Sequence, residues 1–229
     1  MNNITSSDAE KFNRYAITHG MGGAVSDFEQ AFYKKYLPGF SGAILDIGSG
    51  DGKYTHFFAA ESPQSQVVPT DISMVRMERL KSQEFFGPVS SACHLPFRNR
   101  VFGRIFLMQV IEHINNSDAV MKECARVLLP DGVCFVTTPN YPIKRFYDWL
   151  QVIRYGKVNR IFDDPTHCSK FDSTRLKKVV SRYFKNVEVF PTFIAGEGRF
   201  PAIRRWREGR KSSMFFSHKL LAVCRFPQI

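Results

Sequence analysis

Residues 44–54 carry the sequence ILDIGSGDGKY, which decides the fold class. An apolar run that ends at glycines is typical of a buried strand followed by a tight turn. Gly48, Gly50 and Gly52 alternate in this turn, where glycine lets the backbone approach a ligand and adopt conformations that other residues avoid. A helix expected over residues 54–60 offers its first N–H groups to a carboxylate. The stretch therefore predicts a strand–loop–helix unit with a ligand site of the nucleotide-binding type.

Strands and helices alternate along the rest of the chain. Further strands are expected over residues 66–70, 88–93, 104–109, 133–138, 186–190 and 219–225. Helices are expected over residues 73–81, 117–128 and 173–184, and residues 141–164 are expected to form a helical lid. This alternation predicts an α/β fold in which a mostly parallel, seven-stranded sheet has helices on both faces. Because such sheets bind ligands at the carboxyl ends of their strands, we expect the functional residues just after each strand.

The spacing of the glycines distinguishes a dinucleotide-binding loop from other nucleotide-type ligand loops. A dinucleotide-binding fingerprint would place its third glycine at residue 53, which is Lys53. The alternating glycines and the preceding Asp46 instead resemble the first motif of the class I S-adenosylmethionine-dependent methyltransferases. The segments ACHLPF (92–97), QVIEHI (109–114) and ECARVLLPDG (123–132) resemble later segments of the methyltransferase type 11 and ubiquinone-biosynthesis-type small-molecule enzymes. The resemblance covers roughly residues 43–140 and implies a Rossmann-like, doubly wound sheet.

The resemblance implies that the chain binds S-adenosylmethionine. Asp71 ends the second strand about 20 residues past the glycines, where a carboxylate can accept hydrogen bonds from both ribose hydroxyls. Ser91 stands where the family usually carries an Asp that contacts the adenine amino group, and Arg14 and Tyr15 resemble N-terminal residues that close over the cofactor. The expected cofactor contacts are Asp46, Gly48, Ser49, Gly50, Gly52, Tyr54, Asp71, Ile72, Ser91, Ala92 and Gln109.

Two histidines are the catalytic candidates. Methyl transfer from a sulfonium is an in-line displacement, so the protein has mainly to align the acceptor with the methyl group. A hydroxyl acceptor would also need a general base, a role that suits histidine near neutral pH. His113 follows a strand end and is the first candidate, with a bond to backbone or cofactor as the alternative. His167 lies in a segment that resembles the family's acceptor side. Glu112 is an orienting residue or a metal ligand, although one adjacent carboxylate–histidine pair is not enough to predict a metal site.

The net positive charge of the chain comes from its C-terminal part. The net charge is +11; residues 1–140 carry 13 Lys+Arg and 14 Asp+Glu, and residues 141–229 carry the other 19 and 7. Such an excess indicates an anionic partner, or else a solvated basic face. The basic residues of this part lie among aromatic ones and include Lys144, Arg145, Arg154, Lys157, Arg160, Arg199, Arg204, Arg205, Arg207, Arg210 and Lys211.

Several acceptors agree with this composition. We expect methyl transfer to a hydroxyl of a small-molecule or glycan- or lipid-linked anionic acceptor. One alternative is a tRNA or RNA methyltransferase that uses the basic C-terminal part. Another is a catalytically silent scaffold with the cofactor-binding fold. Residues 199–216 combine cationic and bulky apolar side chains, as segments in peripheral membrane contact do. Five scattered cysteines and a polar segment over residues 1–10 favour a cytoplasmic protein, at most peripheral to the inner face of a membrane. We expect one domain: an N-terminal cap (1–40), a cofactor-binding core (41–140) and an acceptor-side part (141–229).

Overall fold

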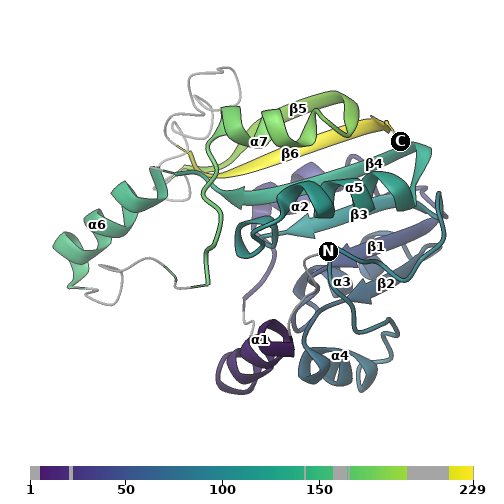
Figure 1. Ribbon diagram of the computed structural model, residues 1–229, viewed down its shortest axis with the longest axis horizontal. Helices are drawn as coiled ribbons and strands as arrows, with labels where there is room; N and C mark the ends of the chain where they lie inside the picture. Colours follow the sequence, from purple (N-terminus) through teal and green to yellow (C-terminus); the bar gives the residue numbers. More distant parts are fainter. Residues whose placement is uncertain are drawn as a thin grey trace.

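The computed structural model (Figure 1) describes residues 6–20, 23–141, 143–156, 164, 166–194 and 217–228. The basic cluster over residues 199–211, the expected membrane segment over residues 199–216, and Lys157 and Arg160 lie outside these residues.

A mixed sheet forms the centre of the fold. Among the described residues it has six strands, in the order β2-β1-β3-β4-β6-β5. They are β1 (Ala43–Ile47), β2 (Gln66–Thr70), β3 (Phe102–Met108), β4 (Leu128–Pro139), β5 (Phe184–Ile194) and β6 (Ser217–Pro227). β1 pairs in parallel with β2 and β3, and β3 with β4, whereas β6 is antiparallel to both β4 and β5. Five strands thus run in one direction, as expected for a mostly parallel sheet.

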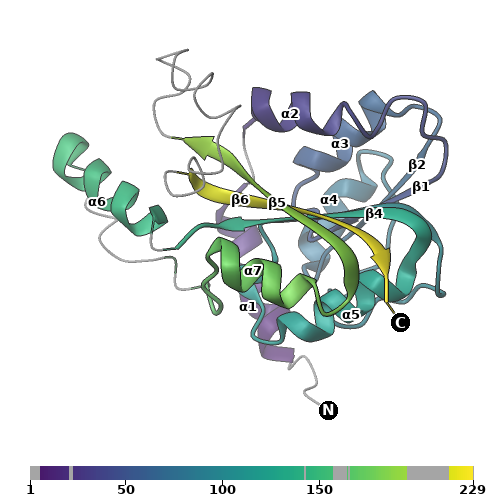
Figure 2. The ribbon, with the colours of Figure 1, turned by 90° about the horizontal axis from the view of Figure 1, so that it is seen from above.

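Helices cover both faces of this sheet, as predicted. The helices are α1 (Ser6–Thr18), α2 (Asp27–Tyr33), α3 (Lys53–Glu61), α4 (Met74–Lys81), the 3₁₀ helix η1 (Ile111–His113), α5 (Ser117–Val127), α6 (Ile143–Tyr155) and α7 (Ser173–Val180). Successive residues of a strand point to opposite faces. Phe106 of β3 therefore packs in a cluster with residues of α2 and α3, and its neighbour Ile105 in a cluster with residues of α5 and α7. Figure 2 shows the two pairs of helices on opposite sides of the sheet.

The expected seventh strand, over residues 88–93, is wrong for the part of the chain that the structure describes. Only Val89 pairs with the sheet, through an isolated bridge to Asp71. Pro88 has no N–H to donate to a ladder. A turn then closes from His94 N–H to the Ser91 carbonyl at 3.0 Å, so the chain leaves the sheet after one bridge.

Other boundaries shift by a few residues. β4 begins at Leu128 rather than at residue 133, because Leu128 pairs with Phe102 and the turn over residues 129–132 becomes an irregularity within the strand. α7 ends at Val180, with Ser181 as its C-cap, and a turn over residues 181–183 leads into β5 at Phe184. α6 occupies part of the expected lid and extends away from the sheet beyond the end of β4 (Figures 1 and 2). None of the described helices is long and apolar enough to cross a membrane.

Candidate active site at the carboxyl edge of the sheet

The predicted functional residues gather at one edge of the sheet. β1 to β4 are parallel, so their carboxyl ends meet there. The glycine loop follows β1, Asp71 follows β2, Gln109 follows β3 and Asn140 follows β4. This is the edge at which doubly wound sheets bind ligands.

The glycine loop has a backbone that requires glycine. Gly48, Gly50 and Gly52 have φ angles of 68°, 59° and 87°, in the left-handed region. A Cβ added to Gly48 would also lie 2.3 Å from Cγ2 of Val110. Amide groups of the loop are tied to β2, since the N–H groups of Gly48 and Ser49 donate to the Thr70 carbonyl at 2.7 and 3.1 Å. The loop is therefore fixed in shape.

The start of α3 differs from that of α2, α4, α5 and α7. Side chains of Ser26, Ser73, Asn116 and Asp172 cap the N-termini of α2, α4, α5 and α7. The N-cap of α3 is Gly52, which makes no side-chain capping bond. The first N–H groups of a helix need an acceptor from outside it and favour negative charge. The glycine loop thus leads into a helix start suited to a ligand carboxylate.

Asp71 joins the glycine loop to α4. One carboxylate oxygen accepts the Gly50 N–H at 3.0 Å, and the other accepts the Ser73 N–H at 2.8 Å. Arg76 lies 3.8 Å away. Burial raises the pKa of Asp71, and the two N–H groups and Arg76 oppose this shift. Each carboxylate oxygen can accept a second hydrogen bond, so Asp71 keeps capacity for two hydroxyl donors.

Asp46 and Tyr54 make contacts within the protein. The buried carboxylate of Asp46 accepts the Thr55 hydroxyl at 2.7 Å, which ties β1 to α3. Burial raises the pKa of Asp46 to about 7. The Tyr54 hydroxyl donates to Glu29 of α2 at 2.8 Å. Their predicted contacts with a cofactor stay predictions.

The remaining predicted cofactor residues lie along the same edge. Half-buried Ile72 follows Asp71, and Ala92 is buried. The Ser91 hydroxyl accepts the Cys93 N–H at 3.0 Å. Gln109 has a φ of 58°, and its N–H donates to the Thr137 carbonyl at 3.1 Å. Left-handed backbone in a residue other than glycine is often found where a structure is built for function.

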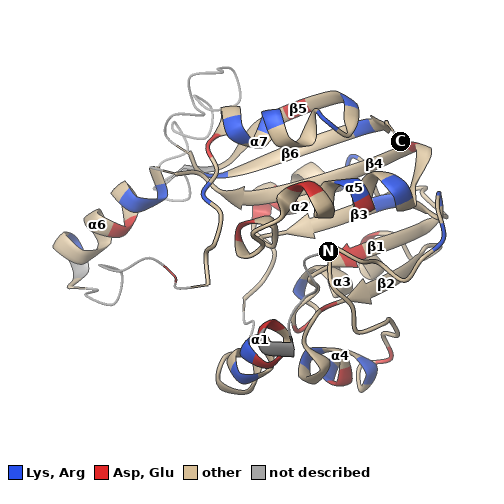
Figure 3. Ribbon diagram, in the orientation of Figure 1, with Lys and Arg blue, Asp and Glu red and all other residues tan. Residues whose placement is uncertain are grey.

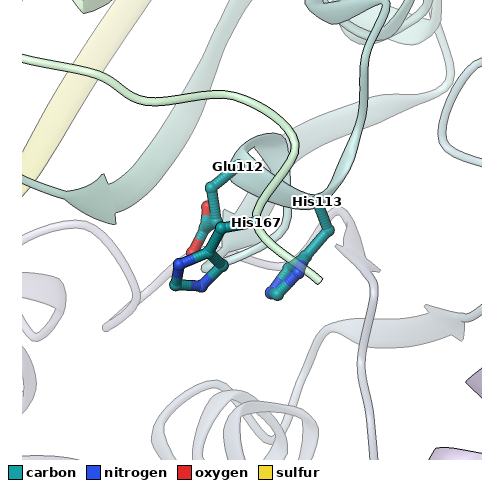
Figure 4. Close-up of side chains that lie close together, drawn as sticks. All are labelled: Glu112, His113 and His167. Atoms are coloured by element: carbon teal, nitrogen blue, oxygen red, sulfur yellow. The ribbon is translucent and has the colours of Figure 1, made fainter. Parts of the chain in front are cut away.

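His113 and His167 lie close together although they are 54 positions apart in the sequence. Their ring centroids are 4.9 Å apart. The loop that carries His167 is bonded to η1, because the N–H groups of Cys168 and Ser169 both donate to the Glu112 carbonyl, at 2.8 and 2.9 Å. Figure 4 shows the side chains of Glu112, His113 and His167 close together.

Hydrogen bonds orient both imidazoles. Nδ1 of His113 lies 2.9 Å from the Thr166 hydroxyl and 3.2 Å from its carbonyl. Nδ1 of His167 lies 2.7 Å from the Tyr141 hydroxyl. Burial, and then the neighbouring His167, lower the pKa of His113. Burial raises the pKa of Glu112 to about 8.

Comparison with known proteins identifies the kind of site. A family model described as a methyltransferase domain matches residues 45–136, which contain the glycine loop, Asp71, Gln109 and His113. Residues 45–136 therefore match a methyltransferase domain, and their relatives support the class I, S-adenosylmethionine-dependent type. The expectation drawn from the glycine spacing is thereby confirmed.

Relatives of this methyltransferase domain include small-molecule enzymes. The chain is 31% identical over 128 residues to a ubiquinone/menaquinone biosynthesis C-methyltransferase of Desulfotalea psychrophila, covering 51% of this chain and 50% of the relative. It is 25% identical to a ubiquinone biosynthesis O-methyltransferase of Actinobacillus pleuropneumoniae, covering 73% and 78%. The chain spans about half the length of the first two curated relatives that it matches. A solved S-adenosylmethionine-dependent methyltransferase of Archaeoglobus fulgidus shares the fold, with a TM-score of 0.64, 16% identity and coverage of 87% and 92%.

The residues of this methyltransferase domain fit its cofactor. S-adenosylmethionine has a carboxylate at one end and two ribose hydroxyls near its centre. The uncapped start of α3 suits the carboxylate, and the acceptor capacity of Asp71 suits the hydroxyls.

Two site residues escaped the sequence analysis. Phe12 of α1 faces the His113 ring edge-on, with centroids 6.0 Å apart. Asn13 accepts the Ser73 hydroxyl at 2.8 Å and so joins α1 to the start of α4. Tyr15, which was expected to close over the cofactor, lies beside Arg76, whose guanidinium carbon is 5.9 Å from the ring centroid. No sequence pattern relates Phe12 to His113, because they meet only through the docking of α1.

Proposed function

We propose that this protein transfers the methyl group of S-adenosylmethionine to a hydroxyl of a small-molecule or glycan- or lipid-linked anionic acceptor. The observation that carries the proposal is the arrangement at the carboxyl edge, where Asp71 and the glycine loop lie on one side and two oriented imidazoles on the other. The proposal divides the chain into a cap (1–40), a cofactor-binding core (41–140) and an acceptor-side part (141–229).

The cofactor-binding core supplies position rather than reactive groups. When bound, S-adenosylmethionine supplies a methyl group already activated by the positive charge of its sulfur. The N–H groups at the start of α3 would hold the carboxylate, and Asp71 the ribose. Ile72, Ser91 and Ala92 would flank the adenine, and Gln109 would lie between the cofactor and the acceptor. Fixing both reactants in this way removes most of the entropy barrier to an in-line displacement.

The acceptor hydroxyl is assigned to the side of the site that holds His113 and His167. An imidazole within hydrogen-bond reach of a hydroxyl can accept its proton as the oxygen attacks. The bonds from Thr166 and Tyr141 fix the orientation of the two rings, which supports this assignment.

The anionic, lipid-linked character of the acceptor is supported by α6. Four large apolar side chains of this helix are exposed: Phe146, Trp149, Leu150 and Ile153, at 62%, 60%, 42% and 70%. Their spacing places them on one face of the helix. Asp148, in contrast, is buried and accepts a bond from Lys144 at 2.8 Å. The helix thus turns a side with four large apolar residues outward, whereas Asp148 is buried.

The positive charge around α6 indicates which kind of partner its apolar face binds. Arg145 lines a surface hollow together with the four exposed apolar residues. Lys and Arg are prominent on α7 and at the start of α6 (Figure 3). A basic helix with exposed aromatic side chains suits the interface of an anionic bilayer. We assign the face to a phospholipid surface that presents a lipid-linked acceptor.

A methyl-transfer assay tests the proposal. Protein is incubated with S-adenosylmethionine labelled on its methyl group and with polyprenyl-phosphate-linked sugars, phosphorylated sugars, hydroxylated aromatic acids or tRNA. We expect label in an anionic hydroxyl acceptor, loss of transfer in His113→Ala, and normal transfer in His94→Ala, which changes an exposed histidine outside the pair. Label in tRNA alone would replace the proposed acceptor with RNA, and cofactor binding without transfer to any acceptor would favour a scaffold.

A further inference from the structure

Three potential metal ligands converge at the acceptor side of the site. One ligand atom from each of Glu112, His113 and His167 lies within 4.8 Å of the others. Two of these residues are adjacent in η1, and the third comes from the loop over residues 164–171. Sequence alone shows only the adjacent pair, which is why no metal site was expected.

Glu112 is the least satisfied of the three. Its side chain is 1% exposed, and its Oε2 atom makes no hydrogen bond of ordinary geometry in the described structure, although the nearby Thr138 hydroxyl favours the charged form. A buried polar atom without a partner destabilises the folded state, and more so when it is charged. The Glu112 carboxylate lies close to the two imidazoles (Figure 4), so a cation between the three side chains would give it a partner.

The surroundings of the imidazoles also suit a metal. Histidines that bind metals commonly have their second ring nitrogen hydrogen-bonded to a carbonyl, carboxylate or water, which fixes the ring. Nδ1 of His113 lies 3.2 Å from the Thr166 carbonyl, and Nδ1 of His167 lies 2.7 Å from the Tyr141 hydroxyl. These bonds orient the rings before any cation binds.

We propose that Glu112, His113 and His167 bind one divalent transition-metal ion, of the Zn²⁺ or Mn²⁺ type. Two imidazole nitrogens and one carboxylate oxygen favour such ions over Ca²⁺ and Mg²⁺, which prefer oxygen ligands alone. Three protein ligands leave positions open for water or substrate, as in catalytic metal sites. Bond lengths of about 2.0–2.2 Å require closer ligands than 4.8 Å, so binding draws the His167 loop toward η1.

This site deepens the proposed function and rests on it for its chemical role. The bound ion would accept the oxygen of the acceptor hydroxyl and lower its pKa, as metals do for bound water. The O–H bond then breaks and the proton passes to solvent. The oxygen forms a bond to the methyl carbon while the carbon–sulfur bond breaks, and the electron pair of that bond stays on sulfur.

Metal binding is tested without cofactor or acceptor. Chelator-treated full-length protein is titrated with Zn²⁺ by calorimetry and with Mn²⁺ by electron paramagnetic resonance. We expect one site per chain, roughly 100-fold weaker binding in Glu112→Gln and His167→Gln, and no change in His94→Ala. Cys168→Ser is the second control, because an exposed thiol adjoins His167 and could bind Zn²⁺ by itself. Thermal unfolding shows whether each variant folds.

The outcomes separate this inference from the proposed function. Absence of binding, or equal affinity in the wild type and the folded Glu112→Gln and His167→Gln variants, would overturn the metal site. Methyl transfer that continues unchanged in metal-free protein would overturn its catalytic role and leave the imidazoles as the base. Metal binding in a protein that fails to bind S-adenosylmethionine would overturn the proposed function and leave the metal site in place.

Discussion

Replacement of Gly48 by alanine tests whether the glycine loop has a left-handed backbone packed closely against Val110. The backbone has a φ of 68°, and the added Cβ would lie 2.3 Å from Cγ2 of Val110. Alanine in the left-handed region costs roughly 1–2 kcal/mol. Overpacking against a neighbouring side chain typically costs about 1–3 kcal/mol more. The free energy of unfolding should therefore fall by roughly 2–5 kcal/mol in Gly48→Ala.

A matched control separates the two contributions. Gly39 has a similar φ of 75°, but a Cβ added there meets nothing within 4 Å. Gly39→Ala should therefore show only the backbone cost, about 1–2 kcal/mol. Alanine lowers the entropy of the unfolded chain in both variants alike, so this effect largely cancels in the comparison.

A double-mutant cycle with Val110→Ala then isolates the contact itself. Shortening Val110 removes the methyl group that the new Cβ would meet, so the double variant should be less destabilised than the sum of the single variants, by about 1 kcal/mol or more. Denaturant unfolding followed by circular dichroism measures all the values. Equal destabilisation by Gly48→Ala and Gly39→Ala, together with additive effects of Gly48→Ala and Val110→Ala, would refute the close packing of the loop.

Three further predictions concern binding, pH and the surface. Asp71→Asn turns an acceptor of two N–H groups partly into a donor and should weaken cofactor binding roughly 10–100-fold; Asp51→Asn in the same loop is the control, and equal affinities would contradict the role of Asp71. Asp46 has its pKa raised to about 7, above its usual value of 3.8, so the folded state holds the proton more tightly and stability falls as pH rises from about 4 to 7, by on the order of 4 kcal/mol. Asp46→Asn should flatten this decline in unfolding free energy, and an unchanged slope would exclude Asp46 as its source. The double variant Phe146→Ser/Trp149→Ser should lose binding to vesicles of phosphatidylglycerol and phosphatidylcholine in sedimentation, whereas Phe86→Ser, which changes an equally exposed ring elsewhere, should not; binding unaffected by the α6 changes would remove the bilayer from the proposal.

The sequence predicted the elements that local signals define. β2 has the predicted bounds, because an apolar run ends at an Asp, and α4 begins after Ser73, because a serine side chain caps its first turn at 3.4 Å. Local signals failed over residues 88–93, where a strand was predicted from a weak pattern. There the absence of an N–H in Pro88 and the turn at Ser91 outweigh strand propensity.

The residues of the site likewise fall into those that local sequence predicts and those that only the tertiary structure brings together. The glycine loop and Asp71 were predictable, because their spacing is a local feature of one strand–loop–helix unit. The convergence of Glu112 with His167 was not, because it depends on two N–H bonds that bring a distant loop back to η1. The outward apolar face of α6 was also hidden, since an amphipathic pattern states which residues share a face and leaves open which face meets solvent.

The most direct test of the central claim is a calorimetric titration of the wild-type protein with S-adenosylmethionine. We predict saturable binding to one site per chain, competed by S-adenosylhomocysteine, because the carboxyl edge offers an uncapped helix start and an Asp71 carboxylate with room for two hydroxyls. Absence of binding at millimolar cofactor by folded protein would contradict it.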